Sequence, residues 1–405
     1  PPLMILFWGV DNFGIWIFLL SIPNIVLIFN FNFTDASVNE MAIYNAKKKY
    51  HKSNEIFQNT IVFLLLNIFI FSLVLLIFFL LNKLDFTILE KLSLKELKII
   101  LFFLLTSVYL RLFESLFATC LNSVGKIYIG YNLEIAKDFF SKFFIVLAGI
   151  FYDSLVIAAL IFFLLNLLKF IFNFYFFMKY KNKISFSFKL ISKKIIFKLI
   201  KLSIGHMSDL WANLIKHSGI IFIIGIFLNP YMVGYISTVK TLFYFMPTSF
   251  FGKINFAINF ELSNLYGSKK MKLIKTILSR YIKITFLLIL AYLAISLAAG
   301  PYIYHYWLNN EYELNIIFLL LIVIDSSFFV IRSTIVSPFA ATNKNITLGI
   351  SDLILTVFGI FLFFLSFHIG KNYIFAFSTV IIFSFTSLIF ASFLVVSFFK
   401  NTKNH

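Results

Sequence analysis

Five polar residues recur at helical spacing inside an apolar stretch of the chain: His206, Asp209, Asn213, Lys216 and His217. At 100° per residue they project from one helix face about 100° wide. An ionisable side chain within a membrane costs about 2.5–3.5 kcal/mol and usually faces a bundle interior or a water-filled cavity. The pattern favours a polar stripe that lines a cavity. A structural contact of Asp209 with Lys216 or Asn213 is the alternative.

Two acid–base pairs also lie in apolar stretches. Arg111 and Glu114 are three residues apart and can pair along one helix face, either structurally or at a cavity. Asp325 and Arg332 are seven apart on another face. Because Arg332 is near the end of its stretch, it can extend to water, so Asp325 is the better functional candidate.

Lys169 and Lys240 have no acidic neighbour at helical spacing and require a partner from another helix or an anionic ligand. Basic candidates outnumber acidic ones, which suits an anionic cargo such as a lipid diphosphate, since Lys and Arg donate charge-assisted hydrogen bonds to its oxygens. We predict these substrate or cavity residues: Arg111, Lys169, Asn213, Lys216, His217 and Lys240. The candidate residues for H⁺ or Na⁺ coupling are Glu114, Asp209 and Asp325.

Pro23 and Pro247 lie in two predicted membrane-spanning segments. Proline removes a backbone hydrogen bond and kinks a helix. The two prolines would give matching hinges for alternating access, unless they are ordinary membrane-helix prolines.

Motifs of several enzyme classes are absent from the chain. It contains no Gly-Lys-Ser/Thr phosphate loop, no His-Glu-x-x-His metal motif and no Gly-x-Ser-x-Gly nucleophile motif. The single cysteine, Cys120, excludes an intramolecular disulfide and a cysteine metal cluster. We therefore expect a protein that is not an enzyme, without catalytic residues, bound metal or organic cofactor.

The composition places nearly the whole chain in a membrane. Of 405 residues, 61% are hydrophobic and only 13% are charged, about half the charged share of a soluble domain. Apolar stretches long enough to cross a bilayer recur throughout. The span at 139–151 is short and is expected to begin earlier, near Tyr131. We predict a stub at 3–9 and spans at 14–31, 60–81, 99–121, 139–151, 154–178, 202–228, 233–252, 281–301, 314–337, 347–368 and 373–399.

Basic residues are distributed unevenly between the loops on the two sides. If every span crosses the membrane, 25 of the 35 lysines and arginines lie on one side. Cytoplasmic loops are enriched in Lys and Arg. The C-terminus and the segment 179–201 are therefore predicted to be cytoplasmic. This distribution explains the net charge of +18 by topology and attraction to anionic lipids, and gives no reason to expect a nucleic-acid partner.

Landmarks of the first half recur about 220 residues later: Gly14 corresponds to Gly234, and Glu40 to Glu261. Duplicated halves are a common plan of membrane transporters. We predict an all-α integral membrane protein with two six-helix lobes, 1–178 and 202–405, joined by a basic linker, 179–201. The first lobe holds five spans and a stub, so we expect a first helix that is truncated here and about twelve spans when intact.

The sequence resembles the Wzx-type polysaccharide flippases of the superfamily that also contains multidrug extruders, known as the MOP superfamily. The resemblance rests on Phe13-Gly14-Ile15-Trp16, on Asp35 followed by a basic loop, on the segment 199–220 and on the turn 229–235. It implies a two-lobed bundle in a bacterial inner membrane that flips polyprenyl-diphosphate-linked oligosaccharide units for O-antigen or capsule assembly. It also implies a polysaccharide polymerase and a chain-length regulator as partners, besides membrane lipids.

Three alternatives stay open. An ion-coupled multidrug extruder of the same fold would require a net acidic cavity, whereas the candidates here are basic in excess. A membrane-embedded polysaccharide polymerase would require a sizeable outer loop with catalytic charges, which the predicted outer loops lack. A degenerate copy without transport activity is the third.

Overall fold

Helices form every regular element in the described part of the chain. The computed structural model describes residues 1–26, 33–46, 48–80, 92–123, 126–152, 154–181, 184, 189–267, 270–341, 346–370 and 372–401. No strand occurs among these residues, so the predicted all-α class is confirmed for them.

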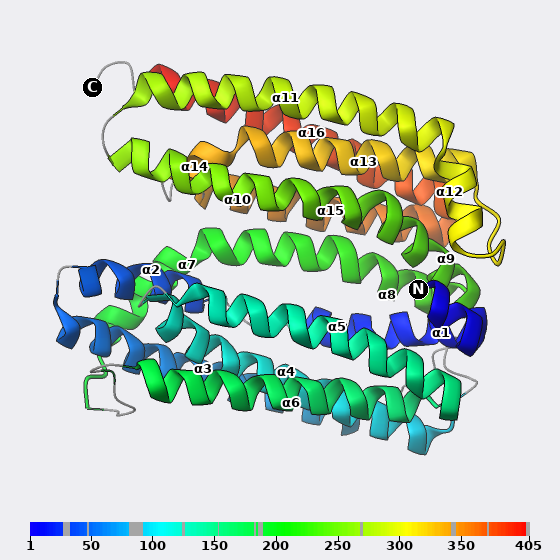
Figure 1. The fold of residues 1–405 in the computed structure, drawn as a ribbon, viewed down its shortest axis with the longest axis horizontal. Helices are drawn as coiled ribbons and strands as arrows, with labels where there is room; N and C mark the ends of the chain where they lie inside the picture. Colours follow the sequence, from blue (N-terminus) through cyan, green and yellow to red (C-terminus); the bar gives the residue numbers. More distant parts are fainter. Residues whose placement is uncertain are drawn as a thin grey trace. The chain divides into compact units, whose positions relative to one another are not determined.

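The helices are labelled in chain order in Figure 1. Their bounds are α1 (Pro2–Val26), α2 (Phe33–Ala46), α3 (Tyr50–Leu80), α4 (Leu94–Ser123), α5 (Ile127–Tyr152), α6 (Leu155–Tyr180), α7 (Lys193–Leu214), α8 (Ile220–Phe227), α9 (Pro230–Lys240), α10 (Met246–Gly267), α11 (Met271–Ala298), α12 (Gly300–Trp307), α13 (Ile316–Ile335), α14 (Ser337–Ala341), α15 (Ile346–Gly370) and α16 (Tyr373–Asn401). Two π-helical turns, η3 (Ile215–Gly219) and η4 (Thr241–Phe245), join α7 to α8 and α9 to α10.

Within the described residues, each predicted span corresponds to a helix or to a continuous run of helices, and the parts of the predicted spans at 27–31 and 81 lie outside these residues. The span predicted at 139–151 does begin earlier, since α5 starts at Ile127. Nine helices in the described part are long and apolar enough to cross a membrane. The chain is therefore a multi-pass membrane protein.

Two compact units make up the chain: a first unit, Leu3–Val233, and a second unit, Gly234–His405 together with Pro1 and Pro2. The boundary falls inside α9. The lobe boundary at the basic segment 179–201 was predicted from the internal repeat and from the lysines of that segment. It stays a prediction.

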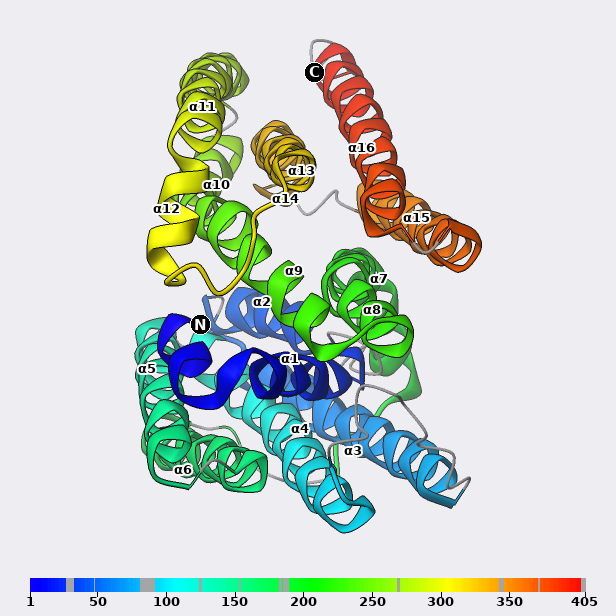
Figure 2. The same cartoon turned by 90° about the vertical axis from the view of Figure 1, so that its right-hand side faces the viewer.

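In the first unit, α4 lies between α3 and α6 (Figure 2), while α5 packs on α6 and α2 packs on α3, α4 and α7. The buried apolar residues of α4 include Leu97, Leu101, Leu104 and Val108. Their spacing of three and four residues places them on one helix face. This face anchors α4 in the middle of the unit.

Glycines allow α1 to approach its neighbours closely within the first unit. A Cβ atom at Gly14 would lie 1.8 Å from the Pro230 carbonyl oxygen, and one at Gly225 would lie 2.0 Å from the Phe18 ring. Gly9 has φ of 74°, a left-handed conformation that breaks the helix. The break falls at the end of the predicted stub 3–9.

The end of the basic segment is fixed to α3 by side-chain amides. The Asn59 amide donates to the Leu190 carbonyl at 2.9 Å, and its oxygen accepts from the Ser192 N–H at 2.8 Å. Gln58 accepts from the Leu190 N–H at 3.0 Å. Both amides are almost fully buried. The two side chains therefore give hydrogen-bond partners to the backbone groups of Leu190 and Ser192, just before α7 begins.

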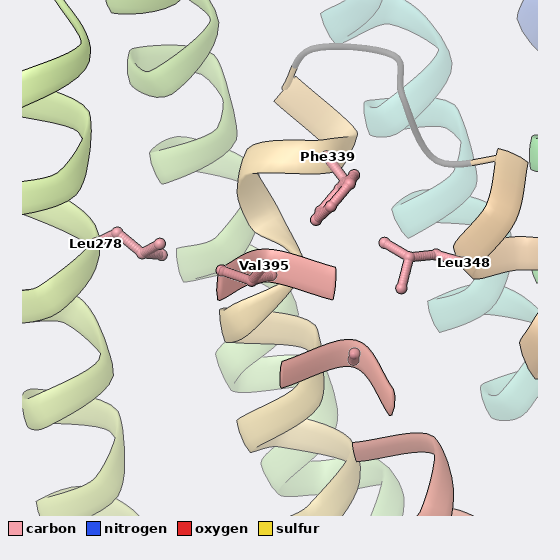
Figure 3. Packing of buried hydrophobic residues seen from close by; sticks show 5 residues of the cluster. Leu278, Phe339, Leu348 and Val395 are labelled. Atoms are coloured by element: carbon pink, nitrogen blue, oxygen red, sulfur yellow. The ribbon is translucent and has the colours of Figure 1, made fainter. Parts of the chain in front are cut away.

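In the second unit, α13 lies between α11 and α16 (Figure 2), and α15 packs on α16. Leu278, Phe339, Leu348 and Val395 form a shared core between α11, α14, α15 and α16 (Figure 3). Ala391 belongs to the same cluster and is fully buried. A small residue at such a site lets helix backbones approach, as in other membrane bundles.

Candidate functional site

The polar stripe predicted from His206 to His217 lies on α7 and continues into η3. Asp209 is half-buried, and Asn213 is exposed with its amide donating to the Asp209 carbonyl at 2.9 Å. Lys216 and His217 are half-buried within the π turn. The side chain of His206 lies outside the described residues.

The π turn corrects the geometry predicted for the stripe. An i→i+5 turn holds about one residue more than an α turn, so it sets residues within and beyond it back by up to about 100°. The common face predicted for the five residues assumed α geometry throughout, and the π turn shifts Lys216 and His217 from the angles that α geometry gives. π turns are frequent at functional sites, and the irregular backbone now marks both residues independently of their charge.

Lys169 on α6 is the centre of a charged cluster in the first unit. Its Nζ lies 2.7 Å from Glu114 Oε1 on α4, and it also pairs with Glu134 on α5. Asn173, one turn further along α6, donates to Glu114 Oε1 at 3.0 Å. The Lys169 side chain is 8% exposed. Sequence spacing left this lysine without a partner, and the fold supplies two from other helices.

Arg111 and Lys137 extend the same cluster. Lys137 pairs with Glu134 at 2.7 Å and with Asp138 at 3.0 Å. Arg111 is within electrostatic range of Glu114 and Asp138. The predicted attraction between Arg111 and Glu114 is present, but Glu114 takes its close contacts from α6. Three cations and three carboxylates meet here, so the cluster is balanced rather than cationic.

Asp325 and Arg332, both on α13, each contact a different neighbouring helix in the second unit. Ser384 on α16 donates to Asp325 Oδ1 at 2.6 Å, and Asp325 is 6% exposed. Arg332 pairs with Asp352 on α15, which also accepts from Ser387 on α16 at 2.5 Å. Arg332 therefore does not simply extend to water, because it closes a three-helix polar contact.

Lys240 is the last residue of α9, directly before η4, and is 3% exposed. Its Nζ lies 6.0 Å from the centre of the Tyr244 ring and 5.9 Å from that of Phe245. A cation over an aromatic face is attracted by the ring quadrupole, more strongly when it is desolvated. Both lysines singled out in the second half, Lys216 and Lys240, therefore lie at or beside a π turn.

The two predicted hinge prolines occupy different settings. Pro23 lies inside α1. It has no N–H to donate to the carbonyl of Leu19, four residues earlier. Pro247 is the second residue of α10, directly after η4. The irregular backbone around Pro247 makes it the stronger hinge candidate.

Several residues of these clusters were not predicted. Asp352 was missed although it lies inside the predicted span 347–368, where any carboxylate is a candidate. Glu134 was missed although its span was expected to begin near Tyr131, which places residue 134 inside it. The contributions of Asn173, Ser384 and Ser387 depend on contacts between helices, which spacing within one helix does not show.

No group of three or more His, Cys, Asp or Glu side chains that could hold a metal ion occurs among the residues searched, those the structure describes. The polar clusters instead combine carboxylates with Lys, Arg, Ser and Asn.

The chain matches no protein-family model and no curated protein sequence. Solved structures match its fold over almost its whole length. An inward-facing multidrug-resistance MATE family transporter of the MOP superfamily superposes with a TM-score of 0.67 at 14% identity, covering 100% of this chain and 97% of its own. The lipid II flippase MurJ in an inward closed conformation gives 0.61 at 16% identity, covering 96% and 87%.

A third match is a MOP superfamily transporter from Pyrococcus furiosus, for which a binding pocket of reverse polarity is described as suggesting a different function. It gives a TM-score of 0.62 at 14% identity, covering 99% of this chain and 93% of its own. The chain therefore has the fold of MATE transporters and of MurJ. At these identities the likeness concerns the fold.

Proposed function

We propose that this chain is a membrane transporter that flips polyprenyl-diphosphate-linked oligosaccharide from the cytoplasmic to the outer leaflet by alternating access. The observation that carries the proposal is the fold, which is similar over nearly the whole chain both to MATE transporters and to a lipid II flippase. The bacterial inner membrane is the matching location, with a polysaccharide polymerase and a chain-length regulator as partners on the outer side.

The charge of the candidate residues supports an anionic cargo. In the first unit Arg111 and Lys169 are balanced by carboxylates. Lys216 and Lys240 are the other basic candidates, and each lies in or directly beside irregular backbone of its own unit. A diphosphate offers several oxygens to such ammonium groups. The reverse pocket polarity described for one protein of this fold supports the idea that polarity follows the cargo.

Ion coupling is the second part of the proposal. Glu114 is held by Lys169 and Asn173, so a second cation would have to displace an ammonium group. Asp325 is buried and receives a neutral hydroxyl from Ser384. Asp325 is therefore the better candidate for binding H⁺ or Na⁺ during transport, ahead of Glu114, which is paired with Lys169, and of Asp209, which is only half-buried.

Complementation tests the proposal. A strain that lacks its own flippase for surface polysaccharide receives the full-length gene as wild type, Lys216→Ala, Lys240→Ala or Lys240→Arg. Wild type should restore surface glycan, both alanine variants should lose most of it, and Lys240→Arg should keep a large part because the charge remains. Lys95→Ala removes an exposed lysine of α4 and is the matched control.

Membrane abundance of each variant is measured by immunoblot, so that loss of transport is separated from loss of protein. Resistance to cationic drugs is measured in the same strains. Full glycan restoration by both alanine variants, or drug resistance without glycan restoration by wild type, would refute the proposed cargo.

A further inference from the structure

Two tyrosine rings in the first unit each have two lysine ammonium groups close by. Lys52 and Lys198 lie 5.8 and 5.9 Å from the centre of the Tyr44 ring. Lys126 and Lys179 lie 5.3 and 5.5 Å from the centre of the Tyr180 ring. Two ammonium groups near one ring concentrate positive charge there, which attracts an anion. The two sites can therefore be compared by asking what supplies that anion.

At Tyr44 the protein supplies the anion. Glu40 on α2 pairs with Lys198 on α7, and the Glu40 side chain is only 16% exposed. A half-buried carboxylate one turn before the tyrosine thus neutralises one of the two lysines. This site is complete without any ligand.

At Tyr180 no carboxylate of the described residues pairs with Lys126 or Lys179. Lys126 also lies 5.8 Å from the ring of Tyr128, which is 54% exposed. The two lysines come from different elements, Lys126 from the turn between α4 and α5, and Lys179 from the last turn of α6. The Tyr180 site therefore resembles the Tyr44 site in having two lysines beside one tyrosine ring. Among the described residues, it has no carboxylate in the place that Glu40 takes at Tyr44.

The position of the Tyr180 site selects the kind of anion. Tyr180 is the last residue of α6, which is long and apolar enough to cross a membrane, and this puts the lysines at the end of the span, where lipid headgroups lie. Tyr and Lys are both favoured at this boundary. Below the lysines, α6 presents exposed apolar side chains such as Phe174, Tyr175 and Met178, along which an acyl chain can lie.

We propose that Lys126 and Lys179, with the rings of Tyr128 and Tyr180, bind the phosphate of an anionic lipid headgroup at the end of α6. The phosphate takes the place that the Glu40 carboxylate has at Tyr44. The site is a bound-lipid site on the first unit, separate from the candidate residues for cargo.

Thermal stability of the purified full chain in detergent tests this site. Phosphatidylglycerol, phosphatidylcholine and inorganic phosphate are titrated separately, and the rise in unfolding temperature gives an apparent affinity. Wild type should be stabilised by phosphatidylglycerol well above phosphatidylcholine. In Lys126→Gln/Lys179→Gln the apparent affinity for phosphatidylglycerol should fall about 30-fold, since two cations near anionic headgroups are lost.

Two further variants keep the result interpretable. Lys193→Gln/Lys194→Gln removes two exposed lysines at the start of α7 and should bind phosphatidylglycerol like wild type. Lys126→Arg/Lys179→Arg preserves the charge and the stacking on the rings, so it should bind phosphatidylglycerol like wild type. If the glutamine variant fails to fold, the proposal is tested by the arginine variant, and loss of binding there would contradict it. Equal losses in the α7 control, unchanged binding in the glutamine variant, or stabilisation by inorganic phosphate as large as that by the lipid would each overturn the proposal.

Discussion

The hydroxyl of Tyr292 on α11 donates a hydrogen bond of 2.5 Å to the backbone carbonyl of Phe243 in η4. Phe243 is four residues before Pro247, which has no N–H to donate to that carbonyl. The side chain of one helix thus supplies the hydrogen bond that proline removes from another. This contact holds the irregular backbone that follows Lys240 in a defined shape.

Replacing Tyr292 by Phe should therefore lower the stability of the chain by about 1–2 kcal/mol, because a buried carbonyl loses its donor. In a Pro247→Ala background the same replacement should cost much less, since the alanine N–H can bond to Phe243. The measurement is a double-mutant cycle by thermal unfolding in detergent. Tyr306→Phe, at a residue 90% exposed, is the control. Equal costs in both backgrounds would show that the Tyr292 hydroxyl does not replace the hydrogen bond that Pro247 removes from the Phe243 carbonyl.

The Lys169 cluster predicts strong coupling between a base and an acid. Lys169→Met alone should destabilise the chain by about 3 kcal/mol, because the buried Glu114 loses its counter-charge. The pair Lys169→Met/Glu114→Gln should recover most of this loss, since Glu114 no longer carries a buried charge and Arg111 stays within electrostatic range of Asp138. Chemical or thermal unfolding measures both. Lys142→Met, at an exposed lysine of α5, is the control and should change little. A double variant as unstable as the single one would contradict the pairing.

Much of the fold could be predicted from the sequence, because the membrane constrains the sequence directly. A helix that crosses the bilayer requires a long apolar stretch, and Lys and Arg are favoured in the loops of one side. The extra residue per turn in η3 could not be predicted in this way, because a π turn is set by packing and leaves no pattern of its own. The partners of Lys169 and Arg332 were missed for a related reason. They come from other helices, so spacing along one helix says nothing about them.

The amide of Asn59 predicts protection of the end of the basic segment. Asn59→Leu should leave the Leu190 carbonyl and the Ser192 N–H without this partner, at a cost of about 1–3 kcal/mol. Hydrogen exchange at the Ser192 amide should accelerate, while exchange in the middle of α4 should not. Asn132→Leu, at an exposed asparagine of α5, is the control. Unchanged exchange at Ser192 would mean that the segment is held by other contacts.

Asp325 predicts how transport depends on ions, if the proposed coupling holds. Asp325→Asn keeps the shape and can still accept from Ser384, but it removes the negative charge that binds H⁺ or Na⁺. Transport in vesicles with an imposed H⁺ or Na⁺ gradient should therefore lose its gradient dependence. Ser384→Ala leaves the charge in place, so it should keep the dependence and shift the ion concentration at half-maximal rate. Because Glu114 is neutralised by Lys169, Glu114→Gln should retain gradient dependence wherever the protein is stable enough to assay. Gradient dependence lost in Glu114→Gln but kept in Asp325→Asn would reverse the assignment and place coupling in the first unit.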